Sequence, residues 1–195
     1  PHCRRQRQMC IRDSNNTKSD EFCFGLKKIT TLPQELNSFK QKENQIYEIS
    51  SEIKKNIVFI SKHLKKNLGA CLIIDYGKNN NIGNTLQSVK NHKYSDPLKY
   101  QGESDLSSLV NFEAIKNYSK EYNLAVTNLI NQGDFLKSLG IKERFTALSK
   151  NMEKEKIDTH VASLKRLIDY NQMGKLFKVL GIRNKKSSPL IGLEI

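Results

Sequence analysis

The stretch GACLIIDYG (69–77) decides the fold that this sequence predicts. It contains most of the longest uncharged apolar run of the chain, residues 68–74, and an acid, Asp75, ends that run. A continuous apolar strand is typical of a parallel sheet that helices cover on both faces. We therefore expect residues 70–76 to form a strand that is buried on both sides.

A helix is predicted just before this strand. Ser50 stands at the position of an N-cap, and Gly69 stands where a C-terminal cap is expected. One apolar stripe at helical spacing lies between them: Ile53, Ile57, Ile60 and Leu64. Asn111 is expected to cap a second helix, and residues 141–149 and 157–168 are predicted to be helical as well. A helix, a short turn and a buried strand follow one another in this way in α/β folds.

The composition is that of a globular chain with a basic surface. The chain has 195 residues and a formal net charge of +13, and 26 of its 33 basic residues are lysines. The lysines alternate with Glu and Asp on predicted helix faces, which favours a solvated exterior over a nucleic-acid surface. A nucleic-acid binder, the alternative, would lose affinity steeply with salt.

The sequence indicates neither a membrane-spanning segment nor a metal site. No apolar run approaches the roughly 20 residues that span a bilayer. The four cysteines include no C-x-x-C pair and the four histidines are scattered, so no metal site is predicted. Sparse thiols without a framework favour a reducing compartment.

Residues 1–14 (PHCRRQRQMCIRDS) differ from the rest of the chain. They begin without a Met, show no apolar periodicity and carry four of the seven arginines. They also lack the apolar segment of a secretory signal. We expect residues 1–14 to be a non-native or disordered basic tail, with a native basic tail as the alternative, and residues 15–195 to form the structural part.

Three stretches carry a resemblance when they are taken together. The first is GACLIIDYG (69–77) with its continuation NTLQSVKNHKYSDPLKYQGESDLSSLVNF (84–112), the second is NQGDFLKSLGIKERFTAL (131–148), and the third is RLIDYNQMGKLFKVLGI (166–182). They resemble the MidA family of class I S-adenosylmethionine (SAM) dependent methyltransferases, which includes a mitochondrial protein needed for respiratory complex I assembly. The resemblance covers about residues 21–193.

The resemblance implies an α/β fold, namely part of a Rossmann-like class I methyltransferase sheet with extra helices. It makes residues 70–76 the fifth strand of that sheet. It makes residues 124–130 and 175–182 the last two strands, which form an antiparallel pair in this fold. The apolar pattern by itself predicts strands at the same places but does not order them in the sheet.

The same resemblance implies SAM as the cofactor of a full-length parent protein. In this fold a Gly-rich turn after the first strand holds the cofactor, because the backbone must approach it closely. None of the ten glycines here stands two residues from another, so the sequence contains no G-x-G. We therefore expect this chain to be the C-terminal part of a methyltransferase. By itself the chain is expected to lack cofactor-binding residues and to be inactive.

Six residues are candidates for the substrate side of the site: Asp75, Tyr76, His92, Glu103, Asp105 and Gln132. Ligands of open α/β sheets gather beyond the carboxyl ends of the strands, where Asp75 and Tyr76 are predicted. The alternatives are that Asp75 caps the next turn and that Tyr76 is a packed wall. His92 lies in a long loop, where it either positions substrate or is solvated. Gln132 opens a helix after a strand, where it either faces the cleft or has a structural role.

A guanidinium is the methyl acceptor that the resemblance implies, because the mitochondrial relative is a protein arginine methyltransferase. A guanidinium stays protonated, with a pKa above about 12, and carboxylates can clamp it in a bidentate manner. Asp75, Glu103 and Asp105 are the acids expected to do so. The alternative for Asp105 is the N-cap of a short helical turn over DLSS (105–108).

Besides the nucleic-acid binder, two functions remain open from the sequence. One is an enzyme that methylates a protein, by resemblance on arginine and in a respiratory complex subunit. The other is an assembly module of the same fold without catalysis. A bacterial cytoplasm is the expected location, and the mitochondrial matrix is the alternative.

Overall fold

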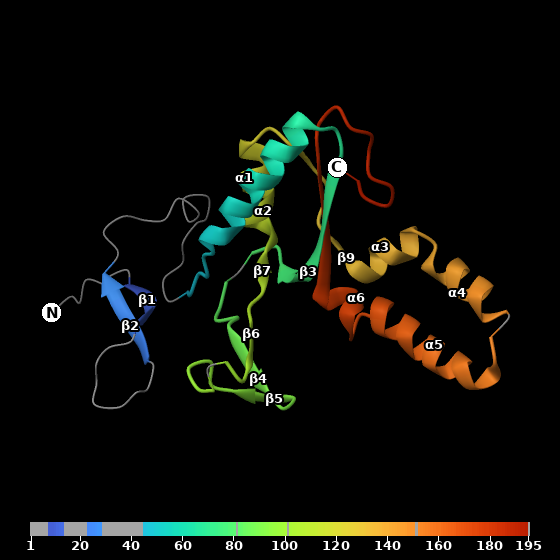
Figure 1. Cartoon of the computed structure of the whole chain (residues 1–195), viewed down its shortest axis with the longest axis horizontal. Helices are drawn as coiled ribbons and strands as arrows, with labels where there is room; N and C mark the ends of the chain where they lie inside the picture. Colours follow the sequence, from blue (N-terminus) through green and yellow to red (C-terminus); the bar gives the residue numbers. More distant parts are fainter. Residues whose placement is uncertain are drawn as a thin grey trace. The chain divides into compact units, whose positions relative to one another are not determined.

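The computed structural model describes residues 8–13, 23–28, 45–80, 82–100, 102–150 and 152–194 (Figure 1). The chain divides into two compact units. The first unit comprises Pro1–Ile49 and Ile82–Ser108, and the second comprises Ser50–Asn81 and Leu109–Ile195. Along the chain, residues 82–108 therefore interrupt the second unit.

The sheet of the second unit is centred on β3 (Ala70–Lys78) and β10 (Phe177–Arg183). These strands pair antiparallel along the whole of β10, with Leu180 opposite Ile73. β8 (Ala125–Val126) and β9 (Ile130–Asn131) pair antiparallel with β10, so they run parallel to β3. The predicted strand over residues 70–76 and the antiparallel final pair are thus confirmed.

The predicted strand over residues 124–130 is interrupted in the structure. The Thr127 amide donates to the Gly181 carbonyl at 3.0 Å, but the Gly181 amide donates to the Thr127 hydroxyl at 2.9 Å instead of to a backbone carbonyl. This side-chain bond breaks the regular ladder between β8 and β9. The final strand also begins later than predicted, because Met173–Leu176 forms the short helix α6.

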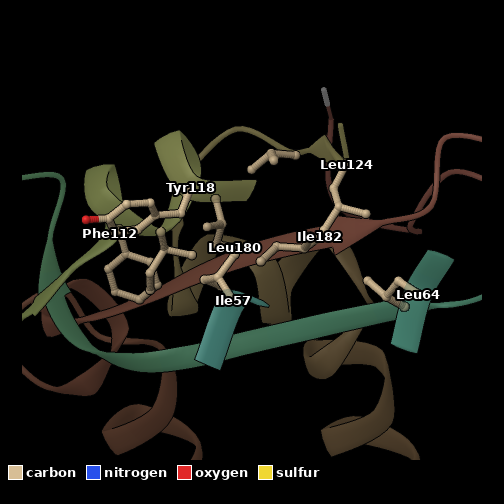
Figure 2. Packing of buried hydrophobic residues seen from close by; sticks show 9 residues of the cluster. Ile57, Leu64, Phe112, Tyr118, Leu124, Leu180 and Ile182 are labelled. Atoms are coloured by element: carbon tan, nitrogen blue, oxygen red, sulfur yellow. The ribbon is translucent and has the colours of Figure 1, made fainter. Parts of the chain in front are cut away.

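Helices α1 (Ser51–Lys66) and α2 (Phe112–Glu121) cover one face of this sheet. The predicted stripe of α1 is confirmed, since Ile57 and Leu64 are buried in the main core cluster. Figure 2 shows these two side chains against Leu180 and Ile182 of β10, with Phe112 closing the cluster. Burial of this apolar surface is the main force that holds the unit together.

The caps of these helices differ in their chemistry. The Asn111 side chain accepts a hydrogen bond from the Ala114 amide at 3.1 Å, as predicted. Ser50 stands at the N-cap of α1, but its side chain makes no capping hydrogen bond. The C-terminal cap predicted at Gly69 is wrong: α1 ends earlier, and the Asn67 amide donates to the His63 carbonyl at 2.9 Å.

The opposite face of the sheet is covered only in part. Phe135 of α3 (Gln132–Ser138) and Leu193 pack on Val179 of β10. The same face of β3 stays open, since Leu72 is 46% exposed and Ile74 is 43% exposed. The prediction that residues 70–76 are buried on both sides is therefore wrong in this structure, because the covering elements pack on β10 and not on β3.

Two more helices complete the second unit (Figure 1). They are α4 (Ile141–Ser149), whose predicted bounds are confirmed, and α5 (Lys154–Ile168), which begins earlier than predicted. The Phe145 and His160 rings stack with their centroids 4.7 Å apart and join the two helices. Across the described residues, no helix has the length and apolar content needed to cross a membrane.

The first unit contains two small sheets. β1 (Gln8–Asp13) pairs antiparallel with β2 (Cys23–Lys28), and the expectation that residues 1–14 form a non-native tail stays a prediction. β4 (Gln87–Lys90), β5 (Lys93–Ser95) and β6 (Asp105–Ser107) form an antiparallel sheet in the order β5-β4-β6. The long loop expected from the sequence therefore contains a small sheet.

The Glu48 carboxylate binds the segment that precedes β4. Glu48 accepts hydrogen bonds from the Thr85 amide at 2.7 Å and the Leu86 amide at 3.1 Å, and it also bonds the Thr85 hydroxyl. Tyr47 forms an isolated bridge with Ile82 beside it. These contacts tie the segment before α1 to the segment before β4 within the first unit.

Candidate functional site

At the end of the second unit's sheet where β3 and β9 finish, residues that were predicted from the sequence lie beside residues that were not. β3 and β9 end at the edge where β10 begins, because both run antiparallel to β10. Lys178 of β10 lies opposite Asp75 of β3 on one side and opposite Asn131 of β9 on the other. Polar side chains from three strands thus form one row at the edge where ligands of α/β sheets bind.

A hydrogen-bond network extends this row onto the helices. The Lys178 Nζ atom donates to Asn131 Oδ1 at 2.6 Å and to the Lys175 carbonyl at 2.7 Å. The Asn131 Nδ2 atom donates to Asp134 Oδ2 at 2.8 Å, and the Tyr170 hydroxyl donates to the same oxygen at 3.3 Å. The network therefore joins β10, β9, the first turn of α3 and the end of α5.

The charges in this network influence each other. Partial burial lowers the pKa of Lys178, as does the nearby Lys175 ammonium, while the Asp134 carboxylate acts in the opposite direction. The Lys137 and Lys175 ammonium groups lie 5.8 Å and 5.7 Å from the centroid of the Tyr170 ring. The arrangement holds several cations close to one carboxylate and one aromatic ring.

Asp75 and Tyr76 lie at the end of β3 as predicted. The Asp75 side chain is exposed, and its Oδ1 atom accepts a hydrogen bond from the Tyr76 amide at 2.7 Å. The Tyr76 ring lies 6.1 Å from the Phe177 ring, centroid to centroid, in a tilted arrangement. The local hydrogen bond matches the turn-capping alternative for Asp75, and the ring pair matches the packed-wall alternative for Tyr76; their substrate roles stay predictions.

Gln132 is buried at the start of α3. Its Nε2 atom donates to the Leu167 carbonyl at 3.0 Å, near the end of α5. The neighbouring Gly133 allows this approach, because a Cβ atom there would stand 2.5 Å from the Ile168 carbonyl oxygen. In this structure the amide joins α3 to α5, and the substrate role proposed for it stays a prediction.

His92 lies at the tip of the hairpin between β4 and β5, in the first unit. Asn91 and His92 have φ angles of 51° and 61°, so both central residues of this two-residue turn are left-handed. Such turns match the twist of the flanking strands and usually contain Asn and Gly. The imidazole is exposed at this tip.

Glu103 and Asp105 are separated by the small sheet. The Glu103 carboxylate forms an ion pair with Lys90 at 2.5 Å. Asp105 is the first residue of β6, exposed and opposite Val89. The helical turn predicted over residues 105–108 is therefore wrong, because this segment pairs with β4 as a strand.

The candidates thus fall into two groups in different units. Asp75, Tyr76 and Gln132 belong to the second unit, and His92, Glu103 and Asp105 to the first. The sequence analysis missed Asn131, Tyr170 and Lys178. The alternation of β10 would have placed Lys178 on the face of Leu180, but its neighbours on β3 and β9 follow only from the strand order.

A shallow cavity of about 470 Å³ lies beside the network. Ile130 and Leu193 give it apolar walls, while Asn128, Asp134 and Glu194 give it polar ones. The C-terminal segment forms one side, since the Asn128 amide donates to the Glu194 carbonyl at 2.7 Å. Among the described residues, no group of three or more His, Cys, Asp and Glu side chains is arranged to hold a metal ion.

Comparison with known proteins identifies the family. A family described as "Putative S-adenosyl-L-methionine-dependent methyltransferase" matches residues 3–130. The mitochondrial protein arginine methyltransferase NDUFAF7 homolog of Drosophila melanogaster is 27% identical over 136 residues, and NDUFAF7 of Danio rerio is 25% identical over 145 residues. These alignments cover 69% and 74% of this chain but 31% and 34% of the relatives, so the chain spans about a third of their length.

Solved structures show the same fold. A COG1565 superfamily member from Burkholderia thailandensis, described as a "likely methyl transferase" bound to S-adenosyl-homocysteine, has a TM-score of 0.74 at 20% identity. That likeness covers 95% of this chain and 50% of the solved chain. A second structure of a COG1565 protein from the same organism gives the same TM-score and covers 94% of this chain. The expected α/β methyltransferase-like fold is thereby confirmed.

Three glycines of the second unit, Gly77, Gly174 and Gly181, lie against atoms of the chain itself. A Cβ atom on Gly77 would meet the Val110 carbonyl oxygen at 2.5 Å, and one on Gly174 would meet the Ile168 carbonyl oxygen at 2.3 Å. One on Gly181 would meet the Leu190 side chain at 2.4 Å. The space beside these three glycines is filled by the chain's own atoms, so none of the three provides the open backbone that SAM needs.

Proposed function

Since the chain belongs to the MidA-type family of SAM-dependent methyltransferases, we propose that it is the C-terminal part of such an enzyme. In this proposal the 195 residues supply the closing strands of the sheet and the substrate side of the site. The cofactor is held by a part of the protein outside these residues. The observation that carries the proposal is the open edge and open face of β3.

The second edge of β3 is nearly free of partners in the described residues. On that edge β7 (Val110–Asn111) pairs only with Gly77 and Lys78, which leaves residues 70–76 unpaired there. Leu72 and Ile74 are exposed on the face beside it. A free edge next to apolar side chains favours association with another strand. Further strands of the same protein would cover both, in agreement with relatives that are more than twice as long as this chain.

The proposed acceptor is an arginine residue of a protein. The relatives from Drosophila melanogaster and Danio rerio are described as mitochondrial protein arginine methyltransferases. Asp75 and Asp105 are exposed carboxylates that can approach a guanidinium, whereas Glu103 already pairs with Lys90. By the family resemblance, a respiratory complex subunit is the proposed protein substrate. The mitochondrial relatives support the mitochondrial matrix as the location, with a bacterial cytoplasm as the alternative.

An assembly module without catalysis is the second candidate. It is favoured by Gly77, Gly174 and Gly181, which pack against their own chain and provide no open backbone for SAM. In that case the family fold would serve to bind a partner protein. The sheet, the open face of β3 and the carboxyl edge would be the same for both functions.

Expression of the longer coding sequence that contains this chain distinguishes the two functions. The parent protein is incubated with methyl-tritiated SAM and an arginine-containing protein extract, and methylarginine is measured after hydrolysis. Labelled methylarginine supports the enzyme, and its absence from a folded parent whose Gly-rich turn is degraded supports the module. The 195-residue chain serves as the matched control, because equilibrium dialysis should detect no micromolar SAM binding to it.

A further inference from the structure

The small sheet of the first unit has one partly covered face and one open face. Ser88 is buried, and its hydroxyl lies 2.8 Å from the Ser95 hydroxyl on the same face. Lys90, two residues further on that face, has its Nζ atom 3.8 Å from the centroid of the Tyr100 ring and 2.5 Å from the Glu103 carboxylate. The segment between β5 and β6 therefore covers the part of this face around Lys90, whereas Leu106, which pairs with Ser88, is 47% exposed.

The other face carries an aromatic ring, an apolar side chain and a carboxylate in one row. Val89 of β4 lies opposite Tyr94 of β5 and opposite Asp105 of β6. Tyr94 is 81% exposed, Asp105 is exposed, and Val89 between them is half-buried. Because neighbouring strands are about 4.8 Å apart, the Tyr94 and Asp105 backbones are separated by about 10 Å across Val89.

This row is complementary to one kind of side chain. A guanidinium stacks on a tyrosine ring and forms an ion pair with a carboxylate, while its aliphatic stem packs on an apolar residue. Side chains alternate between the two faces along a strand, so Lys90 and Lys93 lie on the partly covered face. They are therefore on the opposite face of the sheet from the Asp105 carboxylate. Glu103 forms an ion pair with Lys90, and Asp96, the other acid between β5 and β6, accepts a hydrogen bond from the Leu98 amide at 2.9 Å.

We propose that Tyr94, Val89 and Asp105 form a binding site for an arginine side chain of a protein segment. Only the identification of that arginine as part of a methylation substrate rests on the proposed function. The binding itself requires neither SAM nor the rest of the enzyme. Tyr94 and Val89 become specificity residues for the acceptor, and Asp105 is its counter-ion.

Nuclear magnetic resonance on the isotopically labelled 195-residue chain tests the site. The probes are the peptide acetyl-Gly-Arg-Gly-amide and its citrulline counterpart, which has nearly the same shape without the charge. The arginine peptide should shift the amide signals of Val89, Tyr94 and Asp105, and the citrulline peptide should not. Equal shifts with both peptides, or shifts confined to other residues, would overturn the proposal.

Matched variants separate the row from general electrostatics. Asp105→Asn should weaken binding about three- to fivefold, as for an exposed ion pair. Glu103→Gln removes the same charge from the covered face and should change the affinity by less than about twofold, in line with the small effects of screened surface charges. Tyr94→Leu should weaken binding about threefold, and Tyr94→Phe should retain it, because the ring supplies the attraction. An equal loss in Glu103→Gln and Asp105→Asn would overturn the proposal.

The peptide-binding test and the test of the proposed function can fail independently of each other. A parent protein that transfers no methyl group would contradict the enzyme while leaving the peptide result intact. In an active parent, Asp105→Asn should raise the KM for the protein substrate at least twice as much as it lowers kcat. A variant that lowers kcat with no change in KM would show that Asp105 does not bind the substrate.

Discussion

Gly77 of β3 lies opposite Val110 of β7, and a Cβ atom on Gly77 would stand 2.5 Å from the Val110 carbonyl oxygen. The Phe112 ring would be 2.7 Å from the same Cβ position. This close approach fixes the carboxyl end of β3 against the first turn of α2. The Asp-Tyr-Gly motif therefore includes a glycine that the packing of the second unit requires.

Gly77→Ala should destabilise the chain by about 1–3 kcal/mol, because the added methyl group meets backbone and a buried ring that have no room to move. Urea unfolding followed by circular dichroism measures the change. Gly102→Ala is the comparison: nothing lies within 4 Å of its Cβ position, and its φ of +79° is the only strain. That variant should lose about 1 kcal/mol. A neutral Gly77→Ala variant would contradict the contact.

Asn111→Ala should lower the free energy of unfolding by about 1 kcal/mol, because it removes the side-chain acceptor for the Ala114 amide at the start of α2. The matched control is Ser50→Ala at the start of α1, where the side chain makes no capping hydrogen bond. That change should stay within about 0.5 kcal/mol. Equal losses in both variants would show that Ser50 caps its helix in solution.

Replacing Leu72 and Ile74 by lysine should reduce self-association of the chain while leaving its stability within about 1 kcal/mol, since both side chains are largely exposed. Sedimentation velocity measures the association, and urea unfolding measures the stability. Leu180→Ala, at a side chain that is 0% exposed, should cost about 2–5 kcal/mol. A similar loss in the lysine variant would mean that this face of β3 is covered in the folded chain.

The Lys90 ammonium, by its hydrogen bond and its charge, lowers the pKa of Glu103. A carboxyl group whose folded pKa is lowered stabilises the fold above its unfolded pKa of about 4.3, and this contribution is lost as pH falls through the folded pKa. Lys90→Met should return the pKa of Glu103 toward its ordinary value in a carbon-13 titration. Lys93→Met, the matched control in the opposite strand, should raise it less; an equal rise would contradict the direct pairing.

The helices of this protein were largely predictable from local spacing. The stripe of α1, the Asn111 cap and the bounds of α4 depend on side chains three to four residues apart, which the sequence displays directly. The strand over residues 70–76 was predictable from its apolar run for a similar reason. The end of α1 was mispredicted, because the chain leaves the helix at Asn67 before reaching Gly69.

Contacts between distant segments decided the rest. Whether one or both faces of β3 are covered depends on where α3 and Leu193 pack, and they pack on β10. The position of Lys178 between Asp75 and Asn131 depends on strand order, which no apolar pattern encodes. The separation of Glu103 from Asp105 likewise follows from the pairing of β6 with β4.

The sequence by itself determined the type and approximate place of most second-unit elements, because helical and strand periodicity are properties of neighbouring residues. Only the tertiary structure decided which faces stay open and which polar groups meet. Strand pairing brings together residues that are 47 to 113 positions apart, and its free energy depends on the packing of the whole sheet.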